Sequence, residues 1–163
     1  MRIWRSLGGI VAMACLAGCS TNGADAHTLM LAWSKQYRPS VSRLLQDQTA
    51  YRFDIDTVLM RRSDHRGASF LPARRDCARW TDDARKAEKF PAPPALTVSW
   101  YPYGSMTVDK AWRTWLPAIY RAAKACEEAA SEHEWGSLKA APVLMAPAEP
   151  AEMLLTKALN LVK

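Results

Sequence analysis

Catalytic signature motifs are missing from this chain of 163 residues. The HExxH pattern of zinc hydrolases is absent, because Trp135, Gly136 and Ser137 follow the His133-Glu134 pair. A GxSxG nucleophile elbow, an SxxK motif and a glycine-rich phosphate loop are absent as well, and the whole chain holds only seven glycines. We therefore expect a protein that is not an enzyme, with no catalytic residues, no metal and no cofactor.

Long apolar runs are also missing, since no segment reaches the roughly 20 apolar residues that a transmembrane helix needs. One apolar stretch, Leu7 to Leu16, has the length of a signal-peptide core and follows Arg2 and Arg5. This arrangement predicts an N-terminal segment that directs export and is then removed.

The stretch ends in Leu16-Ala17-Gly18-Cys19, which resembles the lipobox of bacterial lipoproteins. The resemblance implies cleavage after residues 1–18 and lipidation of Cys19, palmitate included. Several acyl chains on one residue would anchor the protein stably to a membrane. Ser20 replaces the aspartate that retains enteric lipoproteins in the inner membrane, so the resemblance implies the outer membrane, facing the periplasm. The alternative is an ordinary secretory signal that happens to contain a cysteine.

Free cysteine is scarce once that segment is accounted for. Cys15 would leave with the signal peptide and Cys19 would carry lipid, so Cys77 and Cys126 are the pair that remains. In an oxidising periplasm we expect them to form a disulfide, which would stabilise the fold by roughly 4 kcal/mol in the chain-entropy model. Zinc is a poor alternative, because neither cysteine belongs to a CxxC motif or lies near two histidines.

Charge of one sign is concentrated in a single segment. The chain carries a net charge of +6, of which Arg2 and Arg5 belong to the predicted signal peptide. Residues 61–89 hold nine basic and five acidic side chains, whereas the segments on either side are balanced. Nucleic acid is not an expected partner, because acids interrupt the basic run and no nucleic-acid-binding module is recognisable.

This basic segment is the candidate binding surface. Its prolines and weak periodicity predict a long loop over 61–94, with one short helix near 82–89. Such a loop can carry function, and an aromatic residue among arginines is typical of an interface hot spot. The predicted partner-binding residues are Arg74, Arg75, Arg79 and Trp80. The alternatives are that Trp80 packs over the disulfide and that the charges are simply solvated.

The pattern of apolar residues predicts an α+β fold with a small, mostly antiparallel sheet. Residues 51–60 alternate in the manner of a half-buried strand, and 95–101 and 105–108 flank a turn at Pro102, Tyr103 and Gly104. Helices are expected over 28–48, which Pro39 interrupts, and over 110–135, which Pro117 kinks. These helices would cover the sheet.

The predicted organisation places one globular domain, residues 27–139, between two accessory segments. Residues 19–26 are small and polar and predict a flexible tether. Residues 140–150 are rich in proline and alanine and predict a linker, and 151–163 predict an amphipathic C-terminal helix.

The residues also offer two chemical alternatives to this noncatalytic interpretation. Asp54 and Asp56, with Asp64 and His65 nearby, would share one face of a strand, where they would hold a metal or act as acid and base. Alternating aspartates are also typical of a solvated face. The tryptophans would stack on glycans if exposed. Three of them, Trp33, Trp112 and Trp115, instead follow apolar helical stripes, and Trp100 lies in a predicted strand.

The sequence thus predicts a noncatalytic module, anchored to the membrane by its N-terminal lipid, that binds an unidentified periplasmic protein. An immunity or inhibitor lipoprotein fits this description by analogy of class. The alternative is a structural or assembly component of a secretion, pilus or conjugation apparatus, with residues 140–163 as its docking arm. A glycan-binding protein or an enzyme is less favoured.

Overall fold

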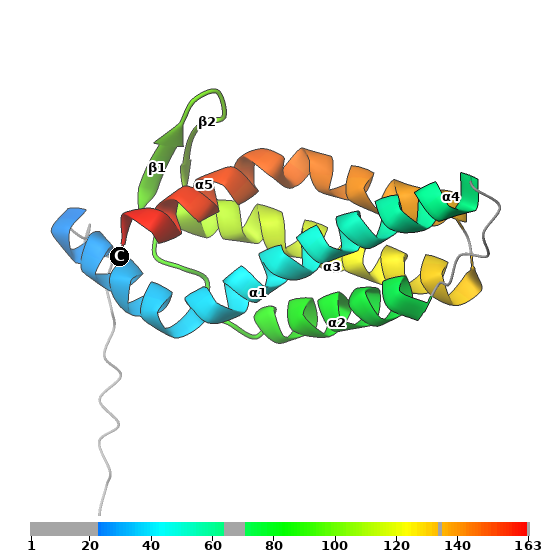
Figure 1. Cartoon of the computed structure of the whole chain (residues 1–163). Coiled ribbons are helices and arrows are strands. Elements are labelled where there is room, and N and C mark those ends of the chain that lie inside the picture. Colours follow the sequence, from blue (N-terminus) through cyan, green and yellow to red (C-terminus); the bar gives the residue numbers. More distant parts are fainter. Residues whose placement is uncertain (1–22, 64–70, 134, 163) are drawn as a thin grey trace, which may run out of the picture.

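The computed structural model describes residues 23–63, 71–133 and 135–162. The fold is α+β, as predicted, with a small antiparallel sheet beside an elongated helical bundle (Figure 1). The elements are α1 (Gly23–Ser63), α2 (Leu71–Ala87), β1 (Thr97–Trp100), β2 (Gly104–Thr107), α3 (Val108–Glu132), α4 (Trp135–Ala140), η1 (a 3-10 helix, Ala141–Ala148) and α5 (Glu149–Leu161). The predicted signal peptide and Cys19 lie outside the described residues.

Helix α3 is the central element of the packing, because α2, α5 and η1 all pack on it. Its buried residues recur every three or four positions, as expected of an amphipathic helix. They are Val108, Ala111, Trp112, Trp115, Leu116, Ala118, Ile119, Ala122, Ala123, Cys126, Ala129 and Ala130. The helix predicted over 110–135 is therefore confirmed. It ends earlier than predicted, because His133 adopts a left-handed conformation and its backbone N–H donates a hydrogen bond to the Ala129 carbonyl.

The strand predicted over 51–60 is wrong, because α1 is helical from Gly23 to Ser63. Aromatic residues alternate there with the two-residue repeat of a strand, but the packing of the whole chain makes the segment helical. Tyr51 is fully buried while Phe53 is 70% exposed, so these two residues do not share a face as they would in a strand. Tyr51 continues the buried helical series of Val41 and Leu44, and its hydroxyl donates a hydrogen bond to the Leu138 carbonyl.

Helix α1 also replaces the predicted pair of short helices over 28–48. Pro39 lies inside it, and Figure 1 shows the helix changing direction between its blue and cyan parts. Proline removes one backbone N–H and pushes against the preceding turn, which is a common cause of such bends. Arg38 then donates hydrogen bonds to the Leu159 and Val162 carbonyls, which fastens the end of α5 to α1.

Helix α2 occupies half of the segment 61–94, which was predicted to be a loop with a short helix at 82–89. Pro72 occupies the second position of α2, where a proline fits without losing a helical hydrogen bond. Ala73, Cys77, Trp80 and Ala84 are buried at spacings of three and four, and Asp83 is the one charged residue of α2 that is buried as well. The predicted Cys77–Cys126 disulfide is present, with 5.5 Å between the two Cα atoms, and joins α2 to α3.

The two later strands form the predicted hairpin, β1 pairing antiparallel with β2 in the register Val98 to Met106 and Trp100 to Gly104. Gly104 has a φ of +79°, a conformation that glycine adopts without the steric cost of a side chain. Only these two strands occur in the described part of the chain. The hairpin projects from the end of the bundle where α3 begins (Figure 1).

The two predicted accessory segments are more ordered than their composition suggests. Residues 141–148, within the predicted linker, form η1, which buries Met145 and Ala148. The predicted C-terminal helix is confirmed as α5 and packs on α3 through Leu154 and Leu155. At the other end, α1 begins at Gly23, so the last four residues of the predicted tether are helical.

Candidate functional site

The exposed face of α2 carries the densest group of cations in the described part of the predicted basic segment. Burial of the opposite face against α1 and α3 fixes which residues point outward. The exposed cationic residues of α2 are Arg74, Arg75, Arg79, Arg85 and Lys86, and Lys89 follows the helix. A helix therefore presents these charges in place of the long loop that the sequence predicted.

Three of these six cations already have a carboxylate partner. Arg79 contacts Asp47 at 2.6 Å and Asp76 at 2.7 Å, and Lys86 contacts Asp83 at 2.8 Å. Arg85 pairs with Asp82 at 3.4 Å. Among the described residues no carboxylate pairs with Arg74 or Arg75, so their charges are available to a partner.

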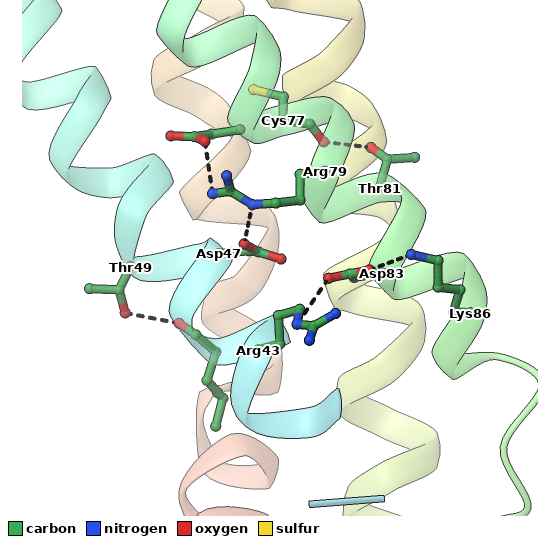
Figure 2. A network of polar contacts seen from close by, with 10 residues as sticks. Arg43, Asp47, Thr49, Cys77, Arg79, Thr81, Asp83 and Lys86 are labelled. Carbon is green, nitrogen blue, oxygen red and sulfur yellow. Dashed lines mark hydrogen bonds and ion pairs between the residues drawn. The ribbon is translucent and has the colours of Figure 1, made fainter. Parts of the chain in front are cut away.

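Two buried carboxyl groups lie side by side beneath this face, one from each helix (Figure 2). Asp47 of α1 is 3% exposed and Asp83 of α2 is 8% exposed. In each, the Oδ2 atom has no hydrogen-bond partner in the described part of the chain. The guanidinium of Arg43 approaches Asp83 Oδ2 at 4.0 Å, so three cations surround the two carboxyls.

Burial shifts the pKa of Asp47. Loss of solvent raises the pKa of Asp47, the hydrogen bond and charge of Arg79 oppose the rise, and the neighbouring Asp83 adds to it. The hydrogen bond to Asp47 raises the pKa of Arg79, and the hydrogen bond to Asp83 raises the pKa of Lys86. Both carboxyls are nearly closed to solvent, and their ion pairs join α1 to α2.

No protein-family model, curated protein or solved structure gives a significant match to this chain. Within residues 23–63, 71–133 and 135–162, no three His, Cys, Asp or Glu side chains gather closely enough to hold a metal ion. In the same ranges, no helix is both long and apolar enough to cross a membrane. The function has to be inferred from the residues of this chain.

The predicted partner-binding residues separate into three groups. Arg74 and Arg75 are exposed and unpaired, as a binding surface requires. Arg79 is half-exposed but holds two carboxylates. The prediction for Trp80 is wrong: its side chain is fully buried and stacks on Tyr51, with 5.3 Å between ring centroids. Trp80 belongs to the core that also contains Cys77 and Cys126, which agrees with the alternative of packing near the disulfide.

The remaining candidates fall outside the site. Asp54 and Asp56 belong to α1, so the strand geometry on which the catalytic alternative depended is absent. Asp64 and His65 lie outside the described residues. Trp33, Trp112 and Trp115 are buried, as predicted. Trp100 is partly buried, and Lys157 lies over its ring at 5.4 Å.

Sequence reasoning missed Asp47, Asp83 and Arg43. The signal was present for the two acids, because each occupies a core-facing position of its helix. Asp47 lies three residues after the buried Leu44, and Asp83 lies three residues after the buried Trp80. A charged residue within an apolar helical series indicates a buried polar contact, but that series is visible only once 41–51 and 73–87 are recognised as helices.

Proposed function

We propose that this chain is an outer-membrane lipoprotein, lipidated on Cys19 and facing the periplasm, whose folded part binds an acidic protein partner. The observation that carries the proposal is the pair Arg74 and Arg75. Both are exposed and have no carboxylate partner among the described residues, whereas the other arginines of α2 hold carboxylates. Arginine donates two parallel hydrogen bonds to a carboxylate and is enriched at protein interfaces.

The rigidity of α2 supports this use. Three contacts hold the helix: the disulfide joins it to α3, and the Trp80 stack on Tyr51 and the Arg79 bond to Asp47 join it to α1. A surface that is already ordered loses little conformational entropy when it binds, so more of the contact energy appears as affinity. An inhibitor or immunity lipoprotein needs such a rigid, noncatalytic surface.

The apparatus alternative draws less support from the same packing. Its docking arm, residues 140–163, would need a free apolar face. Leu154, Leu155 and Ala158 of α5 are instead buried in the bundle, so α2 remains the better candidate for contact with a partner.

Charge reversal tests the binding surface. A photo-crosslinking residue at Ala78, which neighbours both arginines on α2, would trap the partner from periplasmic extract of the producing cells. We expect Arg74→Glu with Arg75→Glu to weaken binding of that partner at least tenfold, about 1.4 kcal/mol, and added salt to weaken the wild-type complex. The control is Arg121→Glu with Lys124→Glu on the exposed side of α3. Equal effects of the two double variants would contradict the proposal.

The anchor has its own test. Cells that express the chain with labelled palmitate should incorporate the label into wild-type protein and not into Cys19→Ser. The wild-type protein should fractionate with outer membranes. A soluble, unlabelled wild-type protein would reject the lipoprotein proposal and leave the α2 surface to be judged by its own experiment.

A further inference from the structure

A pocket of about 340 Å³ opens between α1 and the C-terminal end of α2. Its lining is unusual in combining a buried carboxylate, an aromatic ring and several cations. The lining residues are Ser40, Arg43, Asp83, Lys86, Lys89 and Phe90. Lys86 is about 16 Å along the helix axis from Arg75, so the pocket is separate from the proposed partner surface.

Asp83 organises the cations of the pocket. Its carboxylate accepts a hydrogen bond from Lys86 through Oδ1 and lies beside the Nε of Arg43 through Oδ2. The Asp83 side chain is 9% exposed, whereas those of Arg43 and Lys86 are 65% and 66% exposed. A guanidinium has five N–H donors and an ammonium has three, so each cation keeps donors that face outward. Lys89 is the third cation of the lining, and it has no carboxylate partner in the described part of the chain. With three cations and one carboxylate, the charge of the lining is net positive.

Phe90 supplies an apolar wall. Its ring packs on Tyr37, with 4.8 Å between centroids, and its backbone N–H bonds to the Ala87 carbonyl at 3.0 Å. These contacts hold the ring at the edge of the pocket. The methylene stems of the lysines extend the apolar surface, because only their ends need water. An inorganic anion would leave this wall without contacts.

We propose that this pocket binds an organic oxyanion, a carboxylate or phosphate monoester carried on an aromatic or aliphatic body. The oxyanion would accept hydrogen bonds from Arg43, Lys86 and Lys89, and the body would lie against Phe90. Asp83 is a positioning residue that holds two of the cations in place. The same chemistry can come from a soluble metabolite or from the headgroup and first methylenes of a phosphatidic-acid lipid.

Calorimetric titration of the purified full-length chain tests the pocket, with phenyl phosphate as the soluble probe. We expect phenyl phosphate to bind at least tenfold more tightly than inorganic phosphate or phenol. Inorganic phosphate lacks the ring that would lie against Phe90, and phenol lacks the oxyanion that would bind the cations. Arg43→Gln and Lys89→Gln should each weaken binding about tenfold. Lys124→Gln, which removes a cation on the exposed side of α3, should leave binding unchanged. An unchanged melting temperature in each variant would show that the fold is intact.

A second arm identifies the source of the ligand. Lipid on Cys19 would itself bind vesicles, so this arm uses Cys19→Ser protein. Sedimentation with phosphatidylcholine vesicles that contain phosphatidic acid is compared between this protein and the same protein with Arg43→Gln and Lys89→Gln. Binding of either probe that depends on these two residues supports the pocket, and the probe that binds more tightly identifies the source. Binding that persists in the double variant, or no saturable binding of either probe, would overturn the proposal.

Discussion

Asp47 and Asp83 occupy positions at which their helices otherwise place apolar residues, and two carboxyls therefore meet in the α1–α2 interface. Burial of an ionised carboxyl is costly unless it is paired. Arg79, Arg43 and Lys86 supply the pairing, but each acid keeps one oxygen without a hydrogen bond in the described part of the chain. The pKa of Asp47 is raised, so the fold favours its protonated form, in which the carboxyl gains an O–H donor.

This pair predicts a pH dependence of stability. Because the pKa of Asp47 is raised in the fold, the native state binds the proton more tightly than the unfolded state, whose pKa is near 3.8. The stabilisation is complete below that value and is lost as pH rises through the folded pKa. Urea unfolding from about pH 4 to about pH 7 should show wild type losing stability relative to Asp47→Asn. Parallel curves for the two proteins would contradict the assignment.

Trp80 offers a second test at the residue scale, because its buried position makes it a core residue. Trp80→Ala should lower the free energy of unfolding by about 3 to 5 kcal/mol, the cost of a large cavity. Denaturant unfolding measures this directly. Arg75→Ala, an exposed neighbour on the same helix, should change stability by less than about 0.5 kcal/mol. Similar values for the two variants would mean that Trp80 is not packed in the core.

Among the elements, the hairpin, α3 and α5 could be predicted from sequence, and the reasons are physical. Each has either a turn with defined chemistry or a strong apolar stripe. Helices α1 and α2 were missed over 51–63 and 71–81 because their patterns are ambiguous. The spacing of Tyr51 and Phe53 is typical of a strand. The apolar face of α2 consists largely of alanine, which is a weak hydrophobic signal. The candidate site lies on these two helices, so most of its geometry could not be foreseen.

At the scale of elements, we predict how much the disulfide between α2 and α3 contributes to stability. The Cys77–Cys126 disulfide closes a loop with a sequence separation of 49 residues. Its loss should lower the free energy of unfolding by about 4 kcal/mol, mainly because the unfolded chain regains freedom. Cys77→Ala with Cys126→Ala, compared with wild type in urea, measures the effect. Reduced wild type should match the double variant, and a difference below about 1 kcal/mol would show that packing alone fixes α2.

At the scale of the whole molecule, the early start of α1 constrains the proposed anchored state. Three residues lie between Cys19 and Gly23, and the four Cα-to-Cα steps that join them span at most about 14 Å. The start of α1 would therefore lie close to the membrane. Figure 1 places the hairpin and the end of α5 at the same end of the bundle, whereas the start of α2 lies at the far end. Arg74 and Arg75 would then face the periplasm, where a protein partner can reach them.

Tyr101 provides a measure of this orientation, because its side chain is 93% exposed at the hairpin tip and tyrosine favours the membrane interface. Lipidated Tyr101→Trp in vesicles with brominated acyl chains should lose more fluorescence than Leu144→Trp. Leu144 lies near Glu128 and Glu132, at the end of α3 that is remote from the anchor. The native tryptophans contribute equally to both variants and cancel in the comparison. Equal quenching would mean that the domain does not hold its hairpin end toward the bilayer, even if Cys19 is lipidated.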